Sequence, residues 1–444
     1  MPCDLSILAT LPPEADARRY VQSLLEWKRR DPGIPWAGAT PRPIRSVAIV
    51  GAGMMGTAIA AVHVRHGLTV VIADADGPSL ATAAQRIAAE LELHEGLQET
   101  PRQMVARLVE PTTDDGLIAQ CDLVLESIVE TPVAKQQLYG RLEPRLPTNT
   151  ILASNTSTIP IARLAAGLGE PRRFCGLHFF HPVRLRPLVE IVRGPLTGDD
   201  TVAAAVGLGK SIGKIPIVVA DGPGFLVNRL LVPYLNEALD LLLDGATIDA
   251  LEQAATGFGM AMGPIRLMDE IGLDVALAGG VVLRDAFPER IPASPVLIGL
   301  IKAGRLGCKT RAGFYSYSEA SGPAGPDPAV QAIIARWARP RREFTPEAIL
   351  ARLLLPMVLE ATRILEERRI HDPRDIDLGV LFGLGFPQSR GGLLYWADSI
   401  GVERILEALS TLESLGERAR PTRLLEAMAQ SDCRFAGPEL RRIL

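Results

Sequence analysis

The sequence predicts a doubly wound α/β domain followed by two tandem all-helical domains. Three observations lead to this prediction. Short β-branched runs alternate with helical patterns over residues 45–220. From residue 221 onward, leucine-rich helical periodicity replaces them. Part of that region then recurs 123 residues later, because RLLVPYLNEA at 229–238 returns as RLLLPMVLEA at 352–361.

The composition excludes several classes of protein. The chain has 444 residues, is 47% hydrophobic and 22% charged, and carries a net charge of only -4, which fits neither disorder nor a basic nucleic-acid surface. Its five cysteines are scattered and form no CxxC pair, which argues against disulfides or a zinc ribbon. The sequence has neither a membrane-spanning apolar run nor a signal-peptide core. We therefore expect a cytoplasmic protein that acts on small molecules and binds no nucleic acid.

The first part of the chain should be an arm that leads into the sheet domain. Residues 1–44 contain one predicted amphipathic helix, at 14–29, before a stretch rich in proline and glycine. The sheet domain should span residues 45–220. Its predicted strands are 46–50, 68–73, 122–125, 150–153, 174–177, 188–192 and 215–219.

The helical region should consist of two copies of one domain. Asp269 and Gly272 of the first copy recur as Asp398 and Gly401, so the offset grows to 129 residues. Matched proline and glycine positions favour duplication over a chance similarity of leucine-rich helices. The predicted boundaries are 221–318 for the first copy, 319–345 for a linker and 346–444 for the second copy.

A glycine-rich turn after the first strand predicts a Rossmann-type dinucleotide site. Gly51 permits the tight turn, Gly53 lets a pyrophosphate approach the backbone, and Gly56 lets the following helix pack close to the sheet. Met54 and Met55 begin that helix, and we expect them to contact the cofactor.

Asp74 bears on which dinucleotide binds. It ends the second predicted strand, 23 residues after Gly51, where a carboxylate can accept hydrogen bonds from the ribose hydroxyls. The same charge would repel the 2′-phosphate of NADP, so the sequence favours NAD. Asp74 also begins the turn Asp74-Ala75-Asp76-Gly77, and forming that turn is its alternative role.

A dehydrogenase without a metal needs a base for the hydroxyl proton, and histidine titrates in the right range. His178 and His181 lie just past a strand in the second half of the sheet, at the edge where ligands bind. Surface or structural roles suffice for the other four histidines, which are His63, His66, His94 and His371.

At this point the sequence resembles the 3-hydroxyacyl-CoA dehydrogenase family, from about residue 46 to the C-terminus. The motifs that carry the resemblance are LESIVE at 125, SNTSTIPI at 154, GLHFFHPV at 176, RPLVEIV at 186, DGPGFLVNRLL at 221 and GRLGCKTRAGFYSY at 304. The duplicated helical region and GFPQSRGG at 385 resemble more narrowly the dehydrogenase half of multifunctional fatty-acid β-oxidation enzymes. The hydratase/isomerase half of those enzymes is absent from this sequence.

The resemblance implies NAD-dependent oxidation of (S)-3-hydroxyacyl-CoA to 3-oxoacyl-CoA in β-oxidation or related acyl-thioester metabolism. His178 would be the general base, and Glu190 would hold its imidazolium. The other implied site residues are Ser157 and Asn228 at the substrate, Asn155 at the nicotinamide ribose, and Glu130 and Lys135 as cofactor and substrate contacts. The partner would be an acyl-CoA thioester. The chain would be a monomer or dimer, alone or with a separate enoyl-CoA hydratase.

The sequence departs from this family at His181, where asparagine is usual. The ring could compete with His178 for Glu190, or it could simply cap the turn at Pro182. A metal site of His178, His181 and Glu190 is disfavoured, because the spacing in an extended segment points the two rings apart. We therefore expect no metal. Two other functions stay open: a dehydrogenase of another 3-hydroxy acid or carrier-bound thioester, and a catalytically silent dinucleotide-binding protein.

Overall fold

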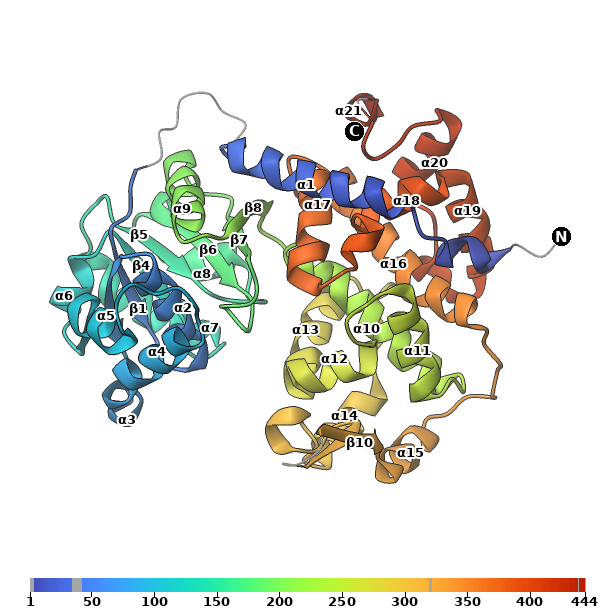
Figure 1. Cartoon of the computed structure of the whole chain (residues 1–444), viewed down its shortest axis with the longest axis horizontal. Helices are drawn as coiled ribbons and strands as arrows, with labels where there is room; N and C mark the ends of the chain where they lie inside the picture. Colours follow the sequence, from blue (N-terminus) through green and yellow to red (C-terminus); the bar gives the residue numbers. More distant parts are fainter. Residues whose placement is uncertain (1–3, 34–41, 319–321, 438, 444) are drawn as a thin grey trace. The chain divides into compact units, whose positions relative to one another are not determined.

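The computed structural model describes residues 4–33, 42–318, 322–437 and 439–443, and the chain forms two compact units (Figure 1). We call Leu24–Phe225 the sheet unit, and Met1–Ser23 together with Leu226–Leu444 the helical unit. The predicted N-terminal helix is present as α1 (Glu14–Arg30). Most of the proline- and glycine-rich stretch that follows it lies outside the described residues. Among the described residues, no helix is long and apolar enough to cross a bilayer.

The sheet unit contains one eight-stranded sheet in the order β3-β2-β1-β4-β5-β6-β7-β8. Its strands are β1 (Ser46–Val50), β2 (Thr69–Ala73), β3 (Val109–Thr112), β4 (Leu123–Glu126), β5 (Ile151–Ser154), β6 (Phe174–Phe179), β7 (Leu188–Arg193) and β8 (Ile215–Ala220). All seven predicted strands are present, with ends within two residues of those expected. β3 was not predicted from the sequence, and its Pro111 is tolerated because the strand lies at the sheet edge.

One strand pair departs from the parallel arrangement. β6 and β7 are antiparallel, whereas the other neighbouring pairs in this sheet are parallel. Only residues 180–187 join β6 to β7, and a connection of that length is too short for the helical crossover that parallel strands require. β7 and β8 are joined by α9 (Asp199–Ser211) and run parallel again.

Apolar helices pack against the sheet. The remaining helices of this unit are α2 (Met54–Arg65), α3 (Gly77–Ala81), α4 (Ala83–Glu92), α5 (Pro101–Leu108), α6 (Asp115–Ala119), α7 (Pro132–Leu142) and α8 (Ile161–Ala165). α2 is buried along most of its length and shares one hydrophobic core with the strands, α4 and α9. His63 belongs to this buried face, where its Nδ1 lies 2.8 Å from the carbonyl oxygen of Ile59.

The helical unit contains the residues of both predicted copies. The first copy comprises α10 (Val227–Leu243), α11 (Ile248–Phe258), α12 (Pro264–Ile271), α13 (Leu273–Ala286) and α14 (Pro295–Lys302). The second comprises α16 (Pro346–Glu366), α17 (Arg374–Gly379), α18 (Leu393–Ile400), α19 (Val402–Ser410), α20 (Arg423–Gln430) and α21 (Leu440–Ile443). Between them lie an antiparallel hairpin of β9 (Tyr315–Ser318) and β10 (Gly322–Pro326), and then α15 (Pro328–Ala335). Neither this hairpin nor α15 was predicted from the sequence.

The long helices α10 and α16 pack together and form reciprocal ion pairs. Arg229 of α10 donates to Glu360 of α16 at 3.0 Å, and the equivalent Arg352 of α16 donates to Glu237 of α10 at 2.5 Å. Arg229 also reaches Glu367, as Arg352 reaches the equivalent Asp244. Each arginine of the repeat is thus neutralised by carboxylates of the other copy.

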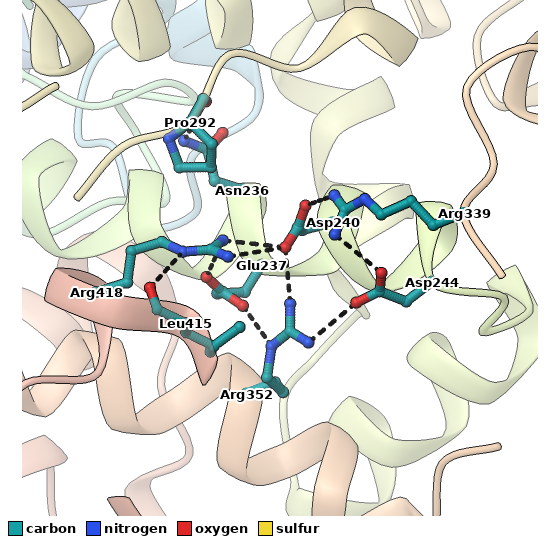
Figure 2. Close-up of polar contacts among 9 residues, drawn as sticks. All are labelled: Asn236, Glu237, Asp240, Asp244, Pro292, Arg339, Arg352, Leu415 and Arg418. Carbon is teal, nitrogen blue, oxygen red and sulfur yellow. Dashed lines mark hydrogen bonds and ion pairs between the residues drawn. The ribbon is translucent and has the colours of Figure 1, made fainter. Parts of the chain in front are cut away.

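Figure 2 shows the ion pairs formed by Glu237, Asp240 and Asp244. Asp240 accepts from Arg352 at 2.9 Å and from Arg418 at 3.0 Å, and Arg339 pairs with both Asp240 and Asp244. Arg352 is buried, with only 4% of its surface exposed. Charges removed from water in this way stabilise the fold only while every partner is present.

We predict that Arg352→Met lowers the free energy of unfolding of the helical unit by about 3–5 kcal/mol, because three carboxylates lose a buried partner. Urea unfolding followed by tryptophan fluorescence measures the effect. Arg18→Met is the matched control, because it removes an exposed pair with Glu14 and should cost under about 1 kcal/mol. A loss as small as that of the control would show that the network is not stabilising.

Candidate active site

The glycine-rich turn has the geometry that a dinucleotide site needs. Gly51 has a φ of 115°, and a Cβ there would collide with the carbonyl of Ser127. A Cβ on Gly56 would collide with the carbonyl of Gly51, so this glycine allows α2 to start directly against the turn. A Cβ on Gly53 would meet no atom within 4 Å, which leaves open space beside the N-terminus of α2. These residues fit a bound pyrophosphate.

A cavity of about 850 Å³ lies beside this turn and is lined by the carboxyl ends of β1, β2 and β4. Gly51, Gly53, Asp74 and Ser127 are among its lining residues. This is where the strand order reverses between β1 and β4, the usual ligand-binding position in such sheets.

Asp74 is half-buried at the cavity and is held by backbone donors. One carboxylate oxygen accepts from the N–H of Ala52 at 2.6 Å, and the other accepts from the N–H of Asp76 at 2.8 Å. The turn-forming role considered above is therefore present, and it orients the carboxylate at the cavity. Met54 begins α2 with 63% of its surface exposed, whereas Met55 packs partly against the core.

The predicted base and its partner lie together on the antiparallel strand pair. The register places His178 of β6 directly opposite Glu190 of β7. His178 Nδ1 lies 2.6 Å from Glu190 Oε2, and both side chains are buried. The rings of Phe180 and Phe225 lie 4.4 and 6.0 Å from the imidazole, centroid to centroid. The pair is therefore largely shielded from water.

Asn155 connects the cavity to the strand of the base. Its side-chain Oδ1 accepts from the N–H of Phe179, next to His178, at 2.9 Å. Its Nδ2 donates to Ser127 Oγ at 3.3 Å, and Ser127 lines the cavity. The position therefore suits a residue that serves both the cofactor and the reacting centre.

Ser157, Glu130 and Lys135 also lie together. Glu130 Oε1 accepts from the N–H of Ser157 at 2.9 Å and from Thr156 Oγ1 at 2.6 Å. Lys135 Nζ lies 3.1 Å from the other oxygen of Glu130. Burial alone would raise the pKa of Glu130, but the charge of Lys135 and these hydrogen bonds outweigh it and lower that pKa.

Glu126 anchors this group and was not predicted from the sequence. It is fully buried at the end of β4 and accepts from Lys135 Nζ at 2.6 Å. Its other oxygen accepts from Tyr139 and Ser154, each at 2.7 Å. The sequence signal for Glu126 was a lone acid at the end of the apolar strand LVLE. Such an acid indicates nearby donors, because a buried carboxylate must be hydrogen-bonded. Lys135 thus holds Glu130 in place from a buried position.

The two remaining predicted residues are His181 and Asn228. His181 is exposed in the segment between β6 and β7 and precedes a cis peptide bond to Pro182. Asn228 belongs to the helical unit, in the first turn of α10, and its approach to a substrate stays a prediction. Within the described part of the chain, no three histidine, cysteine or acidic residues form a cluster suited to a metal ion.

A dinucleotide-binding sheet whose carboxyl edge also carries a buried histidine–carboxylate pair defines the class, a dinucleotide-dependent oxidoreductase. The NAD-binding domain of 3-hydroxyacyl-CoA dehydrogenase matches residues 46–222. The C-terminal domain of the same enzymes matches residues 224–317 and 349–434. Because these matches together cover most of the chain, it belongs to the 3-hydroxyacyl-CoA dehydrogenase family, and its cofactor is NAD.

Solved structures agree with this assignment. A 3-hydroxybutyryl-CoA dehydrogenase from Escherichia coli is 28% identical, with a TM-score of 0.77 over 88% of this chain and 99% of its own. The (S)-3-hydroxybutyryl-CoA dehydrogenase of Ralstonia eutropha is 36% identical, with a TM-score of 0.59 over 62% of this chain and 100% of its own. The dehydrogenase part of multifunctional enzyme 1 from C. elegans is 25% identical, with a TM-score of 0.64, and covers 95% of this chain and 98% of its own.

The geometry of the glycine-rich turn predicts different effects for two glycine substitutions. Gly56→Ala should lower the melting temperature and abolish NADH binding, because its methyl group would force α2 away from Gly51. Gly53→Ala should fold normally and weaken NADH binding at least about tenfold, because its methyl group occupies the open space at the helix N-terminus. Thermal unfolding and NADH fluorescence titration measure both effects. Equal melting temperatures for the two variants would contradict the assigned role of Gly56.

Proposed function

We propose that this protein oxidises (S)-3-hydroxyacyl-CoA to 3-oxoacyl-CoA with NAD, as part of cytoplasmic fatty-acid β-oxidation or related acyl-thioester metabolism. The observation that carries the proposal is the buried 2.6 Å contact between His178 and Glu190 at the carboxyl end of β6. Membership of the family and the two hydroxybutyryl-CoA dehydrogenases among the solved structures support the reaction class.

The proposed mechanism depends on the tautomer of His178. A carboxylate only accepts hydrogen bonds, so Nδ1 carries the hydrogen that faces Glu190, and Nε2 keeps a lone pair for the substrate hydroxyl. Bound NAD supplies the hydride acceptor. As the C–H bond breaks, Nε2 takes the hydroxyl proton, and the O–H electron pair forms the carbonyl bond. The resulting imidazolium lies against the Glu190 carboxylate, which stabilises it.

The other residues would position the reactants. We assign Asn155 to the nicotinamide ribose and Ser157 to the substrate oxygen, because Glu130 orients the backbone and hydroxyl of Ser157. We assign Asn228 to the thioester region of the substrate. The same chemistry on another 3-hydroxy acid or on a carrier-bound thioester is the alternative, and a panel of 3-hydroxyacyl thioesters distinguishes the two.

We further propose one active site per chain. Asn228 precedes Arg229 in the first copy, whereas Ala351 precedes Arg352 in the second, so the second copy lacks the polar group assigned to the substrate. We retain the predicted boundaries 221–318 and 346–444 for the two copies. The second copy would then have a structural role, which agrees with its reciprocal ion pairs to α10.

His178→Gln and Glu190→Gln should each lower kcat by about 100-fold or more with a 3-hydroxyacyl-CoA substrate, while NADH affinity stays within about twofold. The reason is that both variants remove the proton acceptor or its support but leave the cofactor cavity intact. His371→Gln, at an exposed histidine of the helical unit, is the control. Turnover of His178→Gln near the wild-type rate would show that this histidine takes no part in the mechanism. A wild type without activity would favour a catalytically silent binding protein.

Asp74 should determine the preference for NAD. We expect the wild type to use NAD much better than NADP, and Asp74→Ser to narrow this ratio at least about tenfold by relieving repulsion of the 2′-phosphate. Values of kcat/KM for both cofactors give the ratio. Asp4→Ser is the matched control, because Asp4 caps a short helix of the helical unit through Ser6 and does not line the cavity. Equal use of both cofactors by the wild type would sink the assignment.

A further inference from the structure

Glu126 lies in the middle of the carboxyl edge of the sheet, and its charge is buried. Its strand, β4, pairs with β1 on one side and with β5 on the other, where Val50 and Ser154 are the register partners of Glu126. Val50 directly precedes the glycine-rich turn, and Ser154 directly precedes residues 155–158, which we call the polar loop. The side chain of Glu126 is fully buried. Glu126 therefore lies between the glycine-rich turn and the polar loop.

Both carboxylate oxygens of Glu126 accept two hydrogen bonds. Oε1 accepts from the N–H of Ile128 at 2.7 Å and from Lys135 Nζ at 2.6 Å. Oε2 accepts from Tyr139 and Ser154, each at 2.7 Å. Replacing a buried ion pair with apolar side chains often leaves stability unchanged or raises it. Folding alone therefore does not require a glutamate at the end of the apolar strand LVLE.

The first route from Glu126 to the polar loop passes through Ser154. Ser154 Oγ donates to Glu126, and the same oxygen accepts from the N–H of Thr156 at 3.2 Å. The backbone adds a direct link, because the N–H of Asn155 donates to the carbonyl oxygen of Glu126 at 2.8 Å. Ser154 and Thr156 are fully buried, so water does not compete for these hydrogen bonds.

The second route passes through Lys135 and Glu130. Lys135 is only 1% exposed, and its Nζ lies 2.6 Å from Glu126 and 3.1 Å from Glu130. Glu130 Oε1 accepts from Thr156 Oγ1 at 2.6 Å. The same oxygen accepts from the N–H of Ser157 at 2.9 Å and from that of Thr158 at 3.3 Å. Both routes therefore end on the polar loop.

We propose that Glu126 is a positioning residue for the reaction. Its charge holds the polar loop through the two routes, so that Asn155 and Ser157 are placed for the cofactor and the substrate. This inference rests on the proposed function, because it takes the roles of Asn155 and Ser157 from it. Glu126 itself touches neither reactant, since it is fully buried. Loss of its charge should therefore lower turnover and leave the cofactor cavity intact.

Glu126→Gln removes the charge and keeps the size of the side chain. A glutamine amide nitrogen cannot accept hydrogen bonds, so two of the four donors lose their acceptor. With 3-hydroxybutyryl-CoA as the substrate, kcat should fall at least about tenfold, because the polar loop is misplaced. The Kd of NADH should stay within about threefold of the wild-type value. Stopped assays, NADH fluorescence titration and thermal unfolding measure these effects on the full chain.

Asp122→Asn is the matched control. Asp122 lies just before the other end of β4, where its carboxylate accepts from the backbone N–H groups of Arg45 and Ser46. This variant also loses a hydrogen-bonded carboxylate, but it should keep the wild-type kcat. A folded Glu126→Gln variant with a kcat near that of the wild type would overturn the proposal, as would an equal fall of kcat in Asp122→Asn.

Ser154→Ala is a milder variant that tests the first route if Glu126→Gln does not fold. It removes the hydroxyl that links Glu126 to Thr156 and leaves Lys135 and Glu130 in place. Its kcat should fall by about threefold or more, with the Kd of NADH unchanged. An unchanged kcat in Ser154→Ala would contradict the first route.

Hydrogen exchange tests the positioning without any turnover. The amides of Thr156, Ser157 and Thr158 donate along the two routes, so a peptide over residues 155–159 should exchange at least about tenfold faster in Glu126→Gln than in the wild type. In Asp122→Asn the same peptide should exchange as in the wild type. A wild type that turns over no thioester but shows this difference would refute the proposed function alone. An active wild type whose exchange matches that of Glu126→Gln would refute the positioning role alone.

Discussion

The reversal of one strand direction is the constraint on which the candidate site depends. If β7 continued the parallel sheet, a helical crossover would separate it from β6, and Glu190 would not lie directly opposite His178. The short connection of residues 180–187 sets the antiparallel register, and the register brings the carboxylate within 2.6 Å of the imidazole. The same connection carries the carbonyls that bind Lys214. The length of this connection thus determines both the position of the proposed base and that of the segment beside it.

In the helical unit, buried charge has the corresponding role. Leucine-rich helices pack in many registers at similar cost, whereas a buried arginine tolerates only the register that supplies its carboxylates. Arg229 and Arg352 occupy equivalent positions, and each finds its acids on the other copy. These reciprocal ion pairs make the two copies interdependent. They also give the arginine and glutamate of the second copy a structural role, although Ala351 stands where the first copy has Asn228.

Much of the fold could be predicted from the sequence, because strand periodicity, the glycine turn and the repeat are local patterns. The pairing of His178 with Glu190 followed from a family resemblance and not from any local pattern. Glu126 escaped prediction because its donors, Lys135, Tyr139 and Ser154, converge only when β4, β5 and α7 are assembled. β3 and the hairpin of β9 and β10 escaped because their proline and glycine content is typical of loops. Glu126 and β3 thus depend on partners distant in sequence, whereas the hairpin is local and was missed because of its composition alone.

In the sheet unit, one buried carboxylate helps to hold another carboxylate in place. Glu126 is matched by four donors, and one of them, Lys135, is thereby fixed where it also holds Glu130. Glu130 in turn orients the segment that contains Ser157. A chain of this kind transmits the rigidity of the sheet core to a half-buried serine without any covalent link. Its last member is held in place because the earlier members already satisfy one another.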